Sequence, residues 1–89
     1  MTADEIREFM TKGGQIDCGN DDKLKQSVLD VLEDIGLIIG VRRETVKWYR
    51  YIYYSNDIQQ VHMRKNLYGL KVISASPIVL RRHSAERNR

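Results

Sequence analysis

The sequence predicts an α+β domain in which two amino-terminal helices precede an antiparallel meander of three to five strands. Apolar residues recur at helical spacing as far as Ile35, whereas from Leu37 onward they form short extended runs separated by turn residues. Helices followed by strands are typical of the α+β class. We interpret residues 1–80 as one such domain and residues 81–89 as a mobile basic tail, because the tail has four Arg and almost no apolar residue.

The first predicted helix covers residues 3–12. Thr2 and Glu5 have the spacing of a capping box, in which each side chain accepts a hydrogen bond from the backbone amide of the other residue. Gly13-Gly14 ends the helix, because glycine adopts the backbone conformation that follows a last helical turn. Its apolar face comprises Ile6, Phe9 and Met10.

The second predicted helix covers residues 21–35. Asn20 is expected to cap its amino terminus, and Gly36 ends it. The connector before it, residues 15–20, contains one apolar anchor, Ile16, which we expect in a brief extended segment. The helix has an apolar stripe at helical spacing, formed by Leu24, Val28, Val31, Leu32 and Ile35.

The remaining segments are predicted to be extended. Pro77 marks a break or a sheet edge, because proline cannot donate to a strand ladder. Turns are expected at Arg42–Thr45, Ser55–Asp57 and Asn66–Gly69. The predicted strands are Leu37–Val41, Val46–Tyr54, Ile58–Arg64, Lys71–Ala75 and, after the break, Ile78–Leu80.

Charge is distributed unevenly along the chain. Residues 1–40 hold four basic and nine acidic side chains, a net charge of −5, whereas residues 41–89 hold eleven basic and three acidic ones, a net charge of +8. This separation predicts a polyanionic partner for the second half. The longest apolar run has three residues and the amino terminus is acidic, so we expect a cytoplasmic protein with no membrane partner. The small core makes a homodimer a reasonable expectation.

The segment Val46–Tyr54 holds the only Trp and four of the five Tyr. Strand alternation would place Val46, Trp48, Ile52 and Tyr54 toward the core, with Arg50 as the exception, and Lys47, Tyr49, Tyr51 and Tyr53 on the other face. That second face is interpreted either as a cover for the sheet or a protein interface, or as a surface on which nucleic-acid bases stack. The candidate stacking or interface residues are Trp48, Tyr49, Tyr51 and Tyr53.

Our first hypothesis is a small, non-enzymatic protein that binds nucleic acid, either DNA or RNA, or acts as a regulator. Turns at one end of the meander would bring Arg42, Arg43, Arg64 and Lys65 together, and such a cluster is sufficient for phosphate binding. An ordinary solvated surface is the alternative interpretation. The candidate phosphate-binding residues are Arg42, Arg43, Lys47, Arg50, Arg64, Lys65, Arg81 and Arg82.

The segment Val31-Leu32-Glu33-Asp34-Ile35-Gly36-Leu37-Ile38-Ile39-Gly40-Val41 resembles the end of a winged-helix domain. In that family the recognition helix often closes with a Leu-Glu-x-x-Gly-Leu-Ile pattern. The resemblance covers roughly residues 20–54 and implies DNA binding. It implies that Leu37–Val41 and Val46–Tyr54 are the two wing strands and that Arg42–Thr45 is the wing tip. Two features depart from the pattern, because only two helices are predicted where the family has three, and the helix of residues 21–35 is acidic.

Two other functions are compatible with the sequence. A protein-interaction module, such as a phage or mobile-element inhibitor or adaptor, would use the Trp, Tyr and Arg of the aromatic segment. A metal-independent ribonuclease would use His62 with Arg and Tyr side chains. The sequence indicates no catalytic motif, metal site or cofactor. Cys18 has acidic neighbours, Asp17 and Asp21, and is interpreted as an unreactive thiol.

Overall fold

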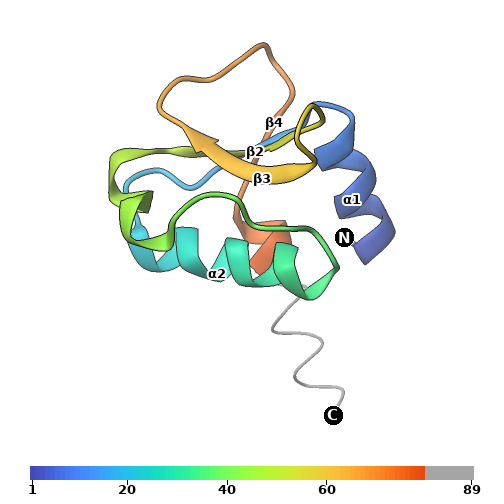
Figure 1. Ribbon diagram of the computed structural model, residues 1–89, viewed down its shortest axis with the longest axis horizontal. Coiled ribbons are helices and arrows are strands. Elements are labelled where there is room, and N and C mark those ends of the chain that lie inside the picture. Colours follow the sequence, from blue (N-terminus) through green and yellow to red (C-terminus); the bar gives the residue numbers. More distant parts are fainter. Residues whose placement is uncertain (80–89) are drawn as a thin grey trace.

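The computed structural model describes residues 1–79, which form two helices and one four-stranded sheet (Figure 1). The α+β class is confirmed. The predicted tail, with Arg81 and Arg82, lies outside the described residues. In chain order the elements are α1 (Ala3–Thr11), β1 (Gln15–Asp17), α2 (Asp22–Asp34), the 3-10 helix η1 (Arg43–Trp48), β2 (Tyr51–Ser55), β3 (Gln60–Arg64) and β4 (Val72–Ser74).

Both helices begin and end close to their predicted bounds. The capping box of Thr2 and Glu5 is present at the start of α1. Asp21, rather than Asn20, caps α2, and its carboxylate accepts a hydrogen bond from the Leu24 amide. At the other end, Gly36 has a φ of +97°, which residues with a side chain rarely adopt, so this glycine stops the helix.

The sheet is mixed, with the strand order β3-β2-β1-β4. β2 and β3 form an antiparallel hairpin, β1 pairs antiparallel with β2, and β4 pairs parallel with β1. The predicted antiparallel meander is therefore wrong for β4, and the segment predicted as a connector supplies the interior strand β1. Three residues with one apolar side chain, Ile16, are too few for a strand period to be visible in the sequence.

Two predicted strands take other conformations. Leu37–Val41 makes only one bridge, in which Ile39 pairs in parallel with Val61. The first part of the aromatic segment, as far as Trp48, belongs to η1. A buried contact stabilises η1 in place of a strand. The Lys25 ammonium lies inside the protein and donates to the Val46 carbonyl (3.1 Å), which holds η1 against α2. Residues 76–79 form a helical turn instead of the start of a predicted last strand, Ile78–Leu80.

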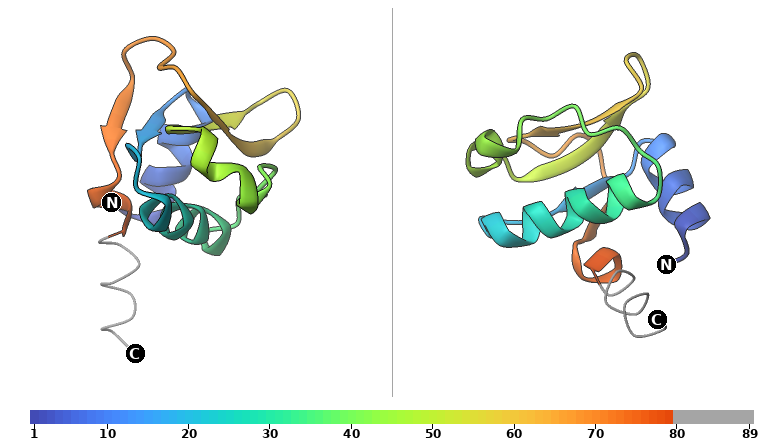
Figure 2. Two further views of the ribbon diagram at one scale, coloured as in Figure 1. Left: turned by 90° about the vertical axis from the view of Figure 1, so that its left-hand side faces the viewer. Right: turned by 60° about the horizontal axis from the view of Figure 1, so that its bottom comes forward.

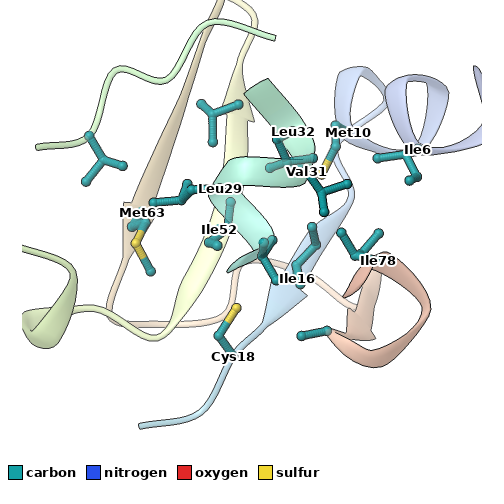
Figure 3. Close-up of a cluster of buried hydrophobic side chains, with 14 of the residues drawn as sticks. Ile6, Met10, Ile16, Cys18, Leu29, Val31, Leu32, Ile52, Met63 and Ile78 are labelled. Atoms are coloured by element: carbon teal, nitrogen blue, oxygen red, sulfur yellow. The ribbon is translucent and has the colours of Figure 1, made fainter. Parts of the chain in front are cut away.

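One face of the sheet, the inner face, packs on α2. Ile16 and Ile52 are fully buried there, with Leu29 and Leu32 of α2 opposite them (Figure 3). The connection from β3 to β4, residues 65–71, crosses the sheet on the side away from α2 (Figure 2). We call that side the outer face. Within residues 1–79, no helix is long and apolar enough to cross a membrane.

Candidate nucleic-acid interface

The outer face combines tyrosine and basic side chains. Strand alternation and register define it, because Ile52 pairs with Ile16 and Met63 on the buried side, so their neighbours point outward. Tyr53 lies opposite His62, and Tyr51 lies opposite Arg64. The outer-face residues of the three strands β1 to β3 are Gln15, Asp17, Tyr51, Tyr53, Ser55, Gln60, His62 and Arg64.

Arg64 occupies an unusual position on this face. Its guanidinium carbon lies 3.7 Å from the ring centroid of Tyr53 and 5.0 Å from that of Tyr68. Its Nε is buried and has no hydrogen-bond partner, and no ion pair links it to a carboxylate of residues 1–79. A guanidinium carries five N–H donors that suit phosphate or carboxylate oxygens. The two rings therefore contact a cation whose Nη groups, unlike the buried Nε, remain available to an anion.

Gln15 positions the second ring of this arrangement. The Gln15 side chain is buried, and its amide donates to the Tyr68 carbonyl (2.5 Å) while its oxygen accepts from the Tyr68 backbone amide (2.8 Å). This pair of hydrogen bonds fixes the middle of the 65–71 crossover over β1. Tyr68 itself remains 77% exposed. The result is an aromatic surface that is held at its backbone and open at its ring.

Three of the candidate phosphate-binding arginines are paired with carboxylates instead. Arg42 lies 3.3 Å from Glu44. Arg43 turns toward α2, where its Nη1 donates to Asp30 (2.8 Å), and it also bonds Gln26. The predicted grouping of Arg42 and Arg43 with Arg64 and Lys65 is therefore not formed: Arg43 contacts α2, whereas Arg64 contacts the outer-face tyrosines.

Arg50 is the third paired arginine. It makes a two-point contact with Asp17, from Nε to Oδ1 (2.9 Å) and from Nη2 to Oδ2 (3.0 Å). The hydrogen bonds from Arg50, assisted by the Gly19 amide, hold the pKa of Asp17 below its ordinary value against a smaller opposing effect of burial. The pair neutralises part of the outer face next to Tyr51, whose ring lies 5.4 Å from the Arg50 guanidinium.

Three lysines complete the set of unpaired cations in this half of the described chain. Lys47 lies 5.4 Å from the Trp48 ring, and Lys65 is exposed directly after β3. Lys71, which the sequence did not single out, ends the crossover and donates to the Lys12 carbonyl (3.2 Å). Lys65 and Lys71 thus begin and end the segment that carries Tyr68.

The aromatic residues are distributed between the core and the surface differently from the prediction, because η1 interrupts the strand alternation. Trp48 was expected in the core and is 57% exposed. Tyr49 was expected outside but is half-buried and packs on the core. From Tyr51 onward the alternation holds, with Ile52 inside and Tyr53 on the outer face.

His62 lies against Gly40, and Cys18 is buried. The His62 imidazole lies within hydrogen-bond distance of the Gln60 side chain (3.2 Å), and both side chains lie against Gly40, where there is no room for a Cβ. Burial raises the pKa of the Cys18 thiol to about 12, and the Asp17 carboxylate adds to the rise. The interpretation of Cys18 as unreactive agrees with this value. Within residues 1–79, no group of three His, Cys, Asp or Glu side chains could hold a metal ion.

Sequence reasoning missed Tyr68 and Gln15. Both were placed in loops, and the hydrogen bonds that join them connect residues 53 positions apart. No local pattern signals such a contact. The neighbouring Lys65 and Lys71 are the nearest clue, because they give the segment around Tyr68 the basic and aromatic composition of a ligand surface.

Comparisons with family models, with curated proteins and with solved structures find no match to this chain. The winged-helix resemblance therefore stays a prediction. The two segments assigned to the wing, Leu37–Val41 and Val46–Tyr54, do not pair with each other in the structure, because the first bridges to Val61 and the second begins in η1.

Proposed function

We propose that this protein binds single-stranded nucleic acid on the outer face of its sheet. The observation that carries the proposal is Arg64, a cation that contacts the rings of Tyr53 and Tyr68 and has no carboxylate partner in the described chain. A phosphate oxygen can accept hydrogen bonds from its Nη groups, and the exposed Tyr68 offers a base a surface for stacking.

The charge of the described residues favours a local site over general attraction. Residues 1–79 hold eleven basic and eleven acidic side chains, so their formal net charge is zero. Long-range attraction to a polyanion is therefore weak for this part of the chain. Binding would depend on the few cations without a carboxylate partner, namely Arg64 beside the tyrosines and the exposed Lys65 that follows it.

The arrangement favours single strands over duplexes. Bases stack on a protein ring only when they are free of a partner strand. Tyr68 presents its ring on a crossover above a short sheet, and residues 1–79 place no cluster of basic side chains along either helix. Groove binding by a helix needs such a cluster to meet the phosphates.

The test is a fluorescence-anisotropy titration at low salt with labelled RNA and DNA single strands of about 12 nucleotides. The duplex of the same sequence serves as the competing ligand. We expect both single strands to bind and the duplex to bind more weakly. Tyr68→Ala should lower the affinity at least about fivefold, since one base-to-ring stack contributes roughly 1–3 kcal/mol.

Ile58→Ala is the matched control, because Ile58 is an exposed apolar residue at 56% exposure and lies in the β2–β3 turn. Its affinity should stay within about twofold of the wild type. Failure of either single strand to bind at low salt would contradict the proposal, and so would equal losses in the two variants.

The proposal keeps the cytoplasmic location predicted from the sequence and includes no catalytic step. The ribonuclease hypothesis stays a prediction, because in residues 1–79 His62 has only the Gln60 side chain as a hydrogen-bond partner. Cleavage of RNA in the presence of a chelator that is lost in His62→Ala would support it. The homodimer likewise stays a prediction.

A further inference from the structure

The outer edge of β3 is paired over only part of its length. β3 is the last strand on its side of the sheet. At Val61 the edge is covered, because the Val61 amide donates to the Ile38 carbonyl (2.7 Å) and the Gly40 amide donates to the Val61 carbonyl (2.8 Å). Backbone groups of alternate residues point to the same side of a strand. Those of Met63 therefore also point outward, and no backbone group outside the sheet bonds to them within residues 1–79.

A pocket of about 370 Å³ opens beside this unpaired position. Past Gly40 the covering segment leaves β3 and turns into η1, which creates a wedge between η1 and the end of β3. His62 and Met63 line one side of the pocket, and Val41, Thr45, Trp48 and Tyr49 line the other. Its volume and mixed apolar and polar lining suit one or two side chains of a bound peptide.

Trp48 is the exposed apolar residue of this pocket. It is the only Trp of the chain, and 57% of it is exposed although the sequence predicted it in the core. Exposed tryptophan beside a pocket is typical of the anchor residues of protein interfaces. The unpaired backbone of Met63 and the ring of Trp48 thus offer two different kinds of contact on either side of one cavity.

The charges around this edge select the kind of partner. Four basic residues lie at this edge: Arg42 lines the pocket, Lys47 is next to Trp48, and Arg64 and Lys65 follow Met63. Among these neighbouring residues there is one acid, Glu44, which pairs with Arg42. A second copy of this chain that paired edge to edge through β3 would bring Arg64 and Lys65 close to their own counterparts. Like charges at that distance oppose such pairing. An acidic segment would instead be attracted.

We infer that the β3 edge is a docking site for an extended, acidic peptide segment of another protein. The segment adds one short strand beside β3 by pairing with the Met63 backbone, and places an apolar side chain in the pocket against Trp48. Exposed strand edges bind peptides through such backbone pairing, while neighbouring pockets provide selectivity. This edge adjoins the outer face and shares Arg64 and Lys65 with the proposed nucleic-acid site, but the Met63 backbone and Trp48 belong to the edge alone, so peptide docking can be tested separately from nucleic-acid binding.

The test uses three blocked synthetic peptides of equal length, labelled for anisotropy. The first alternates Glu with Thr around a central Phe, the second has Lys in place of every Glu, and the third is the first with N-methylated central residues. We expect the first peptide to bind with a dissociation constant below about 1 mM. The second and third should bind at least about tenfold more weakly, because they lose charge attraction and backbone pairing respectively.

Two variants locate the site. Trp48→Ala should weaken binding of the acidic peptide at least about fivefold, whereas Ile58→Ala, of equal exposure, should leave it unchanged. Both residues are exposed, so neither change should prevent folding. In the wild type, Trp48 emission should shift to shorter wavelength when the pocket is filled.

Five outcomes would overturn the inference. The first three are no binding of the first peptide, equal binding of the N-methylated peptide, and an unchanged affinity in Trp48→Ala. The fourth is a concentration-dependent dimer that Trp48→Ala dissociates, since a second copy of the chain would then be the occupant. A Trp48 shift produced by single-stranded oligonucleotide but not by peptide would assign the edge to nucleic acid and would also contradict the inference.

Discussion

Arg43 and Arg64 belong to the same basic half of the sequence, but the fold uses them in different ways. Arg43 is tied to α2 through Asp30 and the Gln26 side chain, so its Nη1 donors are satisfied within the protein. Arg64 is tied only to the faces of two aromatic rings, which fix the cation without satisfying its hydrogen bonds. A count of charges along the chain does not separate these two cases. The two arginines are distinguished by what they contact: a carboxylate and an amide for Arg43, and two aromatic rings for Arg64.

The largest effect on the contrast between Arg43 and Arg64 is expected from a substitution at Gln15. Gln15→Leu removes both hydrogen bonds that hold Tyr68 over the sheet and leaves two backbone groups without their partner. We expect the free energy of unfolding to fall by about 2 kcal/mol, since unsatisfied buried groups cost roughly 1–3 kcal/mol each and water can reach part of this loop. Nucleic-acid affinity should fall as well, because the Tyr68 ring is no longer held beside Arg64.

Urea denaturation and anisotropy titration measure these two effects. Gln59→Leu is the control, because Gln59 is exposed in the β2–β3 turn and makes no hydrogen bond through its side chain within residues 1–79. A Gln15→Leu protein with unchanged stability and unchanged affinity would show that the crossover is held by other contacts.

A substitution at Asp17 is expected to have a smaller effect. It would leave Arg50 without its carboxylate partner, which is already the situation of Arg64. Asp17→Asn releases Arg50 from its carboxylate and removes one negative charge from the outer face. Affinity for single strands should rise by about twofold to fivefold. A decrease, or an affinity that stays the same, would mean that Arg50 cannot reach the ligand.

The same pair predicts how stability depends on pH. Because Arg50 holds the pKa of folded Asp17 below its unfolded value, the carboxylate stabilises the fold above about pH 4, and this contribution is lost as the pH falls through and below that value. Urea midpoints at pH 7 and pH 3 should therefore differ less for Asp17→Asn than for the wild type. Equal differences would show that the pair contributes nothing to acid sensitivity.

The sequence predicted those features that depend on local chemistry. The capping box at Thr2, the glycine stop at Gly36 and the apolar stripe of α2 each act over a few residues, and each lies where it was expected within one or two positions. The unreactive environment of Cys18 was predicted from its acidic neighbours, although burial is the larger cause of the raised pKa of its thiol.

The features that the sequence did not predict depend on distant contacts. Val46 and Trp48 have the composition of a strand, but the buried Lys25 ammonium binds the Val46 carbonyl and stabilises a 3-10 helix instead. β1 has only three residues, too few to show a strand pattern in the sequence. It is a strand because it pairs with β2 and β4. Of the candidate site residues, four lie on or beside the outer face, namely Tyr51, Tyr53, Arg64 and Lys65. Arg42, Arg43 and Arg50 are paired with acids instead.

The most direct test of the account is the salt dependence of single-strand binding for the wild type, Arg64→Ala and Arg43→Ala. Each phosphate contact contributes about 0.7 to the slope of log affinity against log salt concentration. We predict that Arg64→Ala lowers the slope by about that amount and weakens binding, whereas Arg43→Ala keeps the slope and affinity of the wild type and loses only stability. A slope that is unchanged in Arg64→Ala but reduced in Arg43→Ala would contradict the account.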